Sequence, residues 1–223
     1  MRPNEVHIWM SRRPPPGIAP IPSGWTYAEL RRYAGLQFEQ DRSRGIARRG
    51  LLRRVVARYL GCQSSEVELT VRPGGKPELR WPNPNDLAFS ISSSHDLVLV
   101  VIASGMEVGV DVERVCALPE LSRLATIVLN DAEHEAQPAL ASGEQTRWLL
   151  QRWTAKEAVL KASGVGLSVD PRDVFVVRRG NETVARVGEA EWSVTELAVD
   201  QQYVATVASE RRVETILQFE DAW

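Results

Sequence analysis

The feature that most constrains the fold is a repeated order of elements, because helix-periodic and strand-alternating segments occur in two similar halves. The first half has its longest helix pattern at residues 42–60 and the second at 145–162, and glycine follows both. Apolar residues at helical spacing predict these helices, and the glycines predict their ends. Helices beside antiparallel strands indicate an α+β fold. We expect the halves to meet near residues 104–113.

The remaining segments fit the same interpretation. Strand patterns occur at 5–10, 66–71, 87–91, 96–103, 107–113, 174–178, 192–197, 203–208 and 214–219. Shorter helices are predicted at 27–33 and 118–128, with a further helix start at Asp131. The segment 12–24 is predicted to be a surface loop, since its prolines cannot donate to a sheet ladder. We expect an N-terminal lobe at 1–106 and a C-terminal lobe at 107–223.

Composition narrows the class of protein. The 223 residues are 43% hydrophobic and 25% charged, which is typical of a globular chain. A formal net charge of −2 argues against a general nucleic-acid partner. The longest apolar run, 97–103, is too short to span a membrane, and the first ten residues contain no signal-peptide core. With only two cysteines, we expect a cytoplasmic protein.

Lysine is almost absent from this chain, which carries three lysines and 24 arginines. The lysines are Lys76, Lys156 and Lys161. An ammonium is a compact point charge, whereas a guanidinium is a wide planar fork that stays protonated. A compositional bias toward arginine explains the general scarcity, but it makes the three remaining lysines candidates for specific roles.

Two carboxylates alternate with valine in the segment Gly109-Val-Asp-Val-Glu113. On a strand, Asp111 and Glu113 lie on one face about 7 Å apart, close enough to share a hard cation. An ordinary strand with acids on its wet face would show the same alternation, so the pair alone leaves both interpretations open.

Glu157 strengthens the case for a site. At about 100° per residue, Leu149, Leu150, Trp153 and Leu160 form one apolar stripe, and Glu157 falls within it. A buried carboxylate costs several kcal/mol unless a cation compensates for it. A surface ion pair between Glu157 and Lys161 would explain their spacing but not this position.

Three carboxylates make an all-oxygen site, which favours Mg²⁺ over zinc. Magnesium bound in this way usually completes its shell with phosphate oxygens. His95, beside a run of serines, and Lys76, in a Gly-Gly-Lys-Pro turn, are possible phosphate contacts, although a local structural role is also open for each. Of the seven arginines between 42 and 58, Arg44 is singled out, because a solvated face explains most of the others.

The motifs together resemble those of the Sfp-type 4′-phosphopantetheinyl transferases. Residues 109–113 are similar to the signature G-[IV]-D-[IV]-E, and 153–161 (Trp-Thr-Ala-Lys-Glu-Ala-Val-Leu-Lys) to W-x-x-K-E-[AS]-x-x-K. Residues 75–77 resemble the G-K-P element and 94–95 the S-H element. The resemblance runs from about 42 to 167 in the expected order. It implies a pseudo-twofold α+β fold, with two lobes that each pack helices on an antiparallel sheet.

The resemblance also implies a reaction and its site. The phosphopantetheine arm of coenzyme A is moved to a serine of an apo carrier protein, from fatty-acid, polyketide or non-ribosomal peptide synthesis, and adenosine 3′,5′-bisphosphate is released. The implied catalytic residues are Glu157, Lys161 and His95, and the implied Mg²⁺ ligands are Asp111, Glu113 and Glu157. The implied coenzyme A contacts are Arg44, Arg49, Gly75, Lys76, Pro77, Ser94, His95, Asp111, Lys156 and Lys161. A monomer is expected.

One segment departs from the family pattern. The family often reads F-N-x-S-H-S, whereas this chain reads Phe-Ser-Ile-Ser-Ser-Ser-His-Asp at 89–96. Either Ser92 replaces the usual asparagine, or the strand carries an extra pair of residues. A non-catalytic relative that binds carrier proteins or coenzyme A is the main alternative. A nucleic-acid-binding module using the helix at 42–58 is disfavoured by the net charge and by the lack of interleaved aromatic residues.

Overall fold

The computed structural model describes residues 1–12, 31, 35, 37–80, 83, 86–116 and 120–221. All but Arg12 of the loop predicted at 12–24, and all but Arg31 of the helix predicted at 27–33, lie outside these residues. The first half contains β1 (Glu5–Arg12), α2 (Glu39–Leu60), β2 (Leu69–Val71), β3 (Pro77–Leu79), β4 (Leu87–Ser94) and β5 (Leu97–Ser104). The second contains β6 (Val108–Arg114), α3 (Leu121–Val128), α4 (Asp131–Glu135), α5 (Ser142–Ser163), β7 (Val174–Arg179), β8 (Glu182–Val187), β9 (Ala190–Glu196), β10 (Tyr203–Ser209) and β11 (Thr215–Glu220), with two short 3₁₀ turns after α5.

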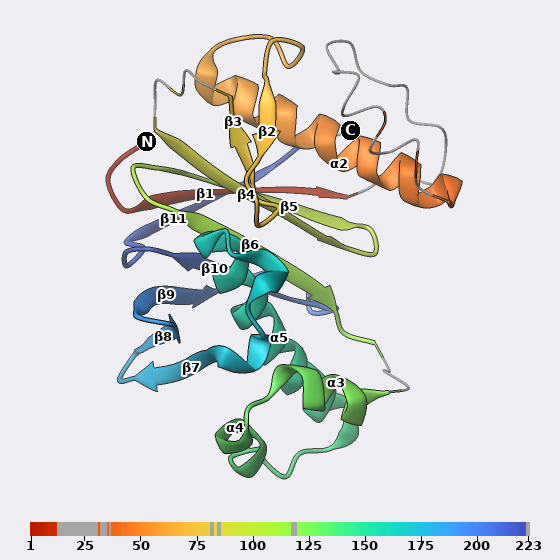
Figure 1. The fold of residues 1–223 in the computed structure, drawn as a ribbon, viewed down its shortest axis with the longest axis vertical. Coiled ribbons are helices and arrows are strands. Elements are labelled where there is room, and N and C mark those ends of the chain that lie inside the picture. The colour runs from red at the N-terminus through yellow and green to blue at the C-terminus, as the bar shows by residue number, and fades with distance from the viewer. Residues whose placement is uncertain are drawn as a thin grey trace.

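The two halves build two sheets by the same pairing rules. The N-terminal sheet has the order β11-β1-β5-β4 and the C-terminal sheet the order β6-β10-β9-β8-β7. In the N-terminal sheet, β1 pairs antiparallel with β5, and β5 pairs antiparallel with β4. In the C-terminal sheet, β6 pairs antiparallel with β10, and β10 pairs antiparallel with β9. A long helix follows the first strand in both halves (Figure 1). The predicted α+β fold with two similar lobes is confirmed.

The C-terminal strand is an addition to this repeat. Strand β11 returns to the N-terminal sheet and pairs in parallel with β1, from Glu5 opposite Thr215 to Met10 opposite Glu220. The last strand of the chain therefore belongs to the sheet of the first half, and the lobe boundary at residue 106 stays a prediction.

Each long helix packs on the sheet of its own half, and the residues at the contact explain why. Leu51, Leu52, Val55 and Val56 of α2 are fully buried and pack against β1, β4 and β5 in one apolar cluster. Helix α5 packs on β6 at Gly109, where an added Cβ would lie 2.1 Å from the carbonyl oxygen of Ala158. Only glycine permits this approach. Both helices end, as predicted, at a left-handed glycine, Gly61 or Gly164.

Some predicted boundaries were wrong. Strand β2 begins at Leu69 rather than residue 66, β4 extends to Ser94 rather than ending at 91, and strands β3 and β8 were not predicted. Strand β8 pairs with β7 and β9 in two consecutive hairpins. The glycines at their turns, Gly180 and Gly188 at positive φ, were the local signal for this strand. No helix in the described part of the chain is long and apolar enough to cross a membrane.

Candidate functional site

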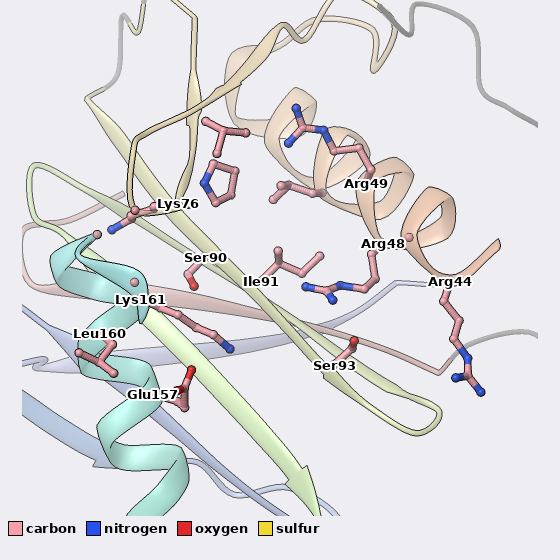
Figure 2. A pocket seen from close by; sticks show the side chains of 18 of the residues that line it. Arg44, Arg48, Arg49, Lys76, Ser90, Ile91, Ser93, Glu157, Leu160 and Lys161 are labelled. Carbon is pink, nitrogen blue, oxygen red and sulfur yellow. The ribbon is translucent and has the colours of Figure 1, made fainter. Parts of the chain in front are cut away.

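A cavity of about 890 Å³ lies where the two halves face each other. Its walls are α2 on one side and the C-terminal half of α5 on the other, with β4 between them and the 74–77 turn at one end (Figure 2). The lining residues are Asp41, Arg44, Gly45, Arg48, Arg49, Leu52, Val71, Gly74, Gly75, Lys76, Pro77, Ser90, Ile91, Ser93, Ser94, His95, Glu157, Leu160, Lys161, Gly164 and Gly166. The cavity thus collects predicted site residues from four separate segments.

Strand alternation aims the acidic pair toward α5. Val108, Val110 and Val112 are buried in the apolar core on one face of β6. Gly109, Asp111 and Glu113 occupy the other face, and Gly109 lies directly against α5. The pair therefore faces the helix that carries Glu157 and Lys161, rather than solvent as an ordinary exposed strand would.

Asp111 is the most buried member of the acidic group, with 3% of its surface exposed. Its Oδ1 accepts a hydrogen bond from Ser92 Oγ at 2.7 Å and from Lys161 Nζ at 2.6 Å. Its Oδ2 is buried and finds no partner among the described residues. A buried carboxylate oxygen left unbonded is costly, so this oxygen is available to a ligand.

Glu113 and Glu157, the two predicted metal ligands beside Asp111, are also partly buried, and burial raises the pKa of both. Burial raises the pKa of Glu157, and the charge of Asp111 adds to that effect while Lys161 opposes it. Burial likewise raises the pKa of Glu113, against a hydrogen bond that Ser94 Oγ donates at 2.8 Å. Within the described chain, Glu157 has no hydrogen bond or ion pair. Both side chains therefore bind a proton more readily than a free glutamate does.

The apolar stripe predicted for the second long helix is largely buried, but it is not the only buried face of that helix, since Ala155, Ala158 and Val159 are buried as well. Leu149 and Trp153 pack against α3, whereas Leu160 packs toward β7 and β9. The helix is buried on several sides, because α3 covers one side and the C-terminal sheet another. Glu157 is half-buried and lines the cavity.

A row of serines on β4 joins the two sheets through hydrogen bonds to β6, and this row was not predicted. Ser90 Oγ accepts from the backbone N–H of Val110 at 3.2 Å. Ser92 and Ser94 donate to Asp111 and Glu113 in the same direction. The alternation 90-92-94 was the available signal. It places Ser92 against Asp111, while Ser90, Ser93 and Ser94 all line the cavity.

Lys161 projects into the cavity toward Asp111, and its ammonium also donates to Ser92 Oγ at 3.1 Å. Figure 2 shows Lys161 and Glu157 on the same side of α5, facing the helix α2 across the cavity. His95 also lines the cavity, but it is exposed in the β4–β5 turn with φ 51°. Its Nδ1 lies 3.4 Å from Ser94 Oγ.

The opposite wall is cationic. Arg44, Arg48 and Arg49 of α2 line the cavity, and Figure 2 shows Arg48 extending over Ile91 and Ser93. Arg44 is 3.7 Å from Asp41 and largely exposed, and Arg49 donates to the carbonyl of Leu69 at 3.1 Å. Arg44 and Arg49 were predicted as ligand contacts and Arg48 was not, because a helix face rich in arginine looks the same in the sequence whether it faces solvent or a cavity.

Lys156 and Lys76 were predicted to contact coenzyme A, but the ammonium group of each bonds other groups of the protein. Lys156 is fully buried, and its Nζ donates to the carbonyl of Val128 at 2.7 Å and to Glu133 at 2.5 Å. It does not reach the cavity, so its prediction as a ligand contact needs correction. One residue of helix rotates Lys156 about 100° away from Glu157. Lys76 is at the cavity, but its ammonium is bonded to Glu107 and two backbone carbonyls.

The three predicted metal ligands do not form a cluster around one point, although Glu113 and Glu157 each interact electrostatically with Asp111. Among the described residues no group of three or more His, Cys, Asp or Glu side chains is close enough to hold a metal ion. The ammonium of Lys161 occupies the side of Asp111 that faces α5. The Oδ2 of Asp111 and the carboxylate of Glu157 nevertheless fit a hard divalent cation, because neither has a hydrogen-bond partner among the residues that the structure describes.

Residues 107–208 match the sequence model of the 4′-phosphopantetheinyl transferase superfamily. The chain is 29% identical over 209 residues to the 4′-phosphopantetheinyl transferase HetI of Nostoc sp., covering 92% of this chain and 87% of that protein. It is 31% identical to a putative 4′-phosphopantetheinyl transferase of Synechocystis sp., covering 74% and 67%. Against the transferase Sfp of Bacillus subtilis the identity is 29%, covering 63% and 60%.

The chain therefore belongs to the 4′-phosphopantetheinyl transferase superfamily. Its motifs and relatives place it with the Sfp-type members, and it is an enzyme of that class, a 4′-phosphopantetheinyl transferase. The predicted family is confirmed, and the predicted non-catalytic alternative is set aside.

Proposed function

We propose that this enzyme transfers the 4′-phosphopantetheine arm of coenzyme A to a serine hydroxyl of an apo carrier protein and releases adenosine 3′,5′-bisphosphate. The supporting observation is the cavity itself, with guanidinium groups on one wall and an ammonium among buried carboxylates on the other. Coenzyme A carries a 3′-phosphate at one end and a pyrophosphate in its middle. A cavity with cations at two separated places suits such a ligand.

The nucleotide end would bind along α2 and the 74–77 turn. Arg44, Arg48 and Arg49 can meet the 3′-phosphate with charge-assisted hydrogen bonds. The backbone of Gly75 and the ring of Pro77 form the adjoining surface, where the adenine would lie. Ser94 and His95, at the end of β4, would contact a phosphate from the other side of the cavity.

The transfer itself would take place at α5. The carrier serine oxygen forms a bond to the β-phosphorus, and the bond from that phosphorus to the bridging oxygen breaks, so that the adenosine bisphosphate leaves. Glu157 would accept the serine proton, since its carboxylate lines the cavity and has no ion-pair partner in the described part of the chain. Lys161 would direct an ammonium at the transferring phosphate, where oriented positive charge stabilises the transition state.

A divalent cation completes the proposal. Asp111, Glu113 and Glu157 would hold Mg²⁺, which neutralises charge on the pyrophosphate as it shifts to the leaving group. Ser92 holds Asp111 in place through its bond to Oδ1. Lys161 would then exchange part of its contact with Asp111 for the phosphate.

The experiment is direct. Wild-type enzyme, coenzyme A and Mg²⁺ are incubated with apo carrier proteins from fatty-acid, polyketide and non-ribosomal peptide systems, and intact masses are measured. We expect the mass of one phosphopantetheine on at least one carrier and adenosine 3′,5′-bisphosphate in the supernatant. Product without added divalent metal, in the presence of a chelator, would refute the Mg²⁺ part. The monomeric state and the cytoplasmic location stay predictions.

A further inference from the structure

The Lys76 ammonium lies at the junction of the two halves, in contact with residues that follow it by 31 to 86 positions. It donates to the Glu107 carboxylate, to the carbonyl of Val108 at 3.0 Å and to the carbonyl of Ala162 at 2.8 Å. Its side chain is 4% exposed. An ammonium has three donors, and here all three have acceptors. No donor remains for a ligand in the cavity.

One of these acceptors is the end of the helix that carries Glu157 and Lys161. Ala162 lies in the last turn of α5, where backbone carbonyls have no partner within the helix. A buried cation at this position satisfies one such carbonyl and also interacts favourably with the negative end of the helix dipole. Glu107 completes the arrangement by neutralising the charge. Burial lowers the pKa of Lys76, and the hydrogen bond to Glu107 opposes that shift.

The backbone around Lys76 touches the loop after α5. A Cβ added at Gly74 would lie 1.7 Å from the carbonyl oxygen of Gly164, and one at Gly166 would lie 2.2 Å from the carbonyl oxygen of Gly74. The 73–77 turn thus rests on the 164–166 loop without room for a side chain. Lys76 passes through this contact to reach α5. The turn and the helix end form one continuous wall of the cavity.

We propose that Lys76 is a positioning residue: its ammonium fixes the last turn of α5, and with it Lys161, against the turn that lines the nucleotide end of the cavity. It acts through Ala162 and does not touch the substrate. The inference rests on the proposed function, because the reaction is what this alignment serves. It corrects the expectation that Lys76 binds coenzyme A with its side chain.

This role explains why the position is lysine in a chain that otherwise uses arginine. A guanidinium spreads its donors in one plane and needs a wider space, whereas these acceptors surround a single point. Lys156 shows the same arrangement independently. It is fully buried and bonds the carbonyl of Val128, the last residue of α3, together with the carboxylate of Glu133.

The test compares Lys76→Met and Lys76→Arg with the control Arg72→Met. Arg72 also bonds Glu107, at 2.6 Å, but is 41% exposed and does not line the cavity. Hydrogen exchange of peptides covering 157–166, measured without coenzyme A, should be at least about tenfold faster in both Lys76 variants and unchanged in the control. In the transfer assay, both should lose kcat at least about tenfold while the KM for coenzyme A changes less than about threefold.

Direct phosphate binding would give a different result. Arginine is a good phosphate ligand, so Lys76→Arg would then retain both kcat and KM, and Lys76→Met would raise KM. That pattern, or unchanged exchange in 157–166, overturns the proposal. If Lys76→Met does not fold, Glu107→Gln provides the same exchange test with a milder change. If the wild-type enzyme transfers nothing, the proposed function fails, whereas the exchange result still decides whether Lys76 fixes α5.

Discussion

The two long helices have the same length and the same place in the repeat, yet they face the cavity with different chemistry. Helices α2 and α5 are each 22 residues long, and each covers its own sheet. At the cavity α2 places arginines that are half-buried or exposed, whereas α5 places Glu157 and Lys161 beside the buried Asp111. Under the proposed function, α2 binds the charged ligand, and α5 provides the groups that move a proton and a phosphate.

The difference in burial explains this division. Charged groups near water interact weakly, and those removed from it interact strongly. Arginines on α2 can therefore adjust to a ligand at little cost to the fold. The group on α5 is fixed by Ser92, Asp111 and the packing at Gly109. We expect substitutions on the two walls to affect different kinetic parameters.

The largest effect is expected on the α5 wall. Glu157→Gln removes the proposed base and one metal ligand while keeping the shape of the side chain, so kcat should fall by about 10³-fold or more. Single-turnover transfer to an apo carrier, followed by intact mass, measures this. A variant within tenfold of wild type would show that Glu157 is neither base nor metal ligand.

Lys161→Met should have the next largest effect. Removing an oriented cation from a water-poor site costs on the order of 10²–10³ in kcat. The same substitution frees Oδ1 of Asp111 and Ser92 Oγ from their bonds to the ammonium. Titration of activity with Mg²⁺ would separate the two consequences, since a loss that high Mg²⁺ restores fully would place Lys161 in metal binding rather than in transition-state stabilisation.

On the α2 wall we expect a change in KM instead. A hydrogen bond to a charged group contributes about 1.5–3 kcal/mol, so Arg44→Ala and Arg48→Ala should each raise the KM for coenzyme A about tenfold or more, with kcat nearly unchanged. Arg58→Ala is the matched control, because Arg58 lies on the same helix but bonds Asp221 away from the cavity. An equal rise in KM for Arg58→Ala would contradict the assignment of this wall.

The smallest effect is expected on the melting temperature of Glu157→Gln, measured without a divalent metal. Burial raises the pKa of Glu157 above its ordinary 4.5, so the folded state binds this proton more tightly than the unfolded state. Its contribution to stability is present at low pH and is lost as the pH rises through the raised pKa. At pH 7.5 with a chelator, Glu157→Gln should therefore melt roughly 2 °C or more above wild type.

The pH dependence supplies the control for that measurement. The difference in melting temperature between Glu157→Gln and wild type should shrink as the pH falls toward and below 4.5, because Glu157 is protonated first in the folded state and then, below its ordinary pKa of 4.5, in the unfolded state as well. A constant difference across this range would mean that the variant is stabilised by packing and not by removal of a buried charge.

Local pattern was enough to predict the helices, most strands and the acidic pair, since these depend on periodicity and on glycine. The fold class was predicted from the repeated order of elements and from the spacing between the motifs at 109–113 and 153–161. The failures had two origins. Strand β8 was missed although the glycines of its two hairpin turns signal it locally. The acceptors of Lys156 lie on α3 and α4, and their position depends on how distant segments pack.

The site was predicted in its composition but not in its contacts. Ser92 was noted only as a departure from the family pattern, although it holds Asp111. Arg48 and Ser93 were not selected as site residues, because nothing local distinguishes a side chain that faces a cavity from one that faces water. Lys76 was expected to meet the ligand, and its ammonium instead bonds α5 and Glu107.

The most direct measurement of the central claim is the mass of an apo carrier protein after incubation with coenzyme A, Mg²⁺ and either wild-type enzyme or Glu157→Gln. The account predicts a gain of one phosphopantetheine with wild type and none with the folded variant over the same time. Equal modification by both proteins would contradict it, as would the absence of modification by wild type on every class of carrier.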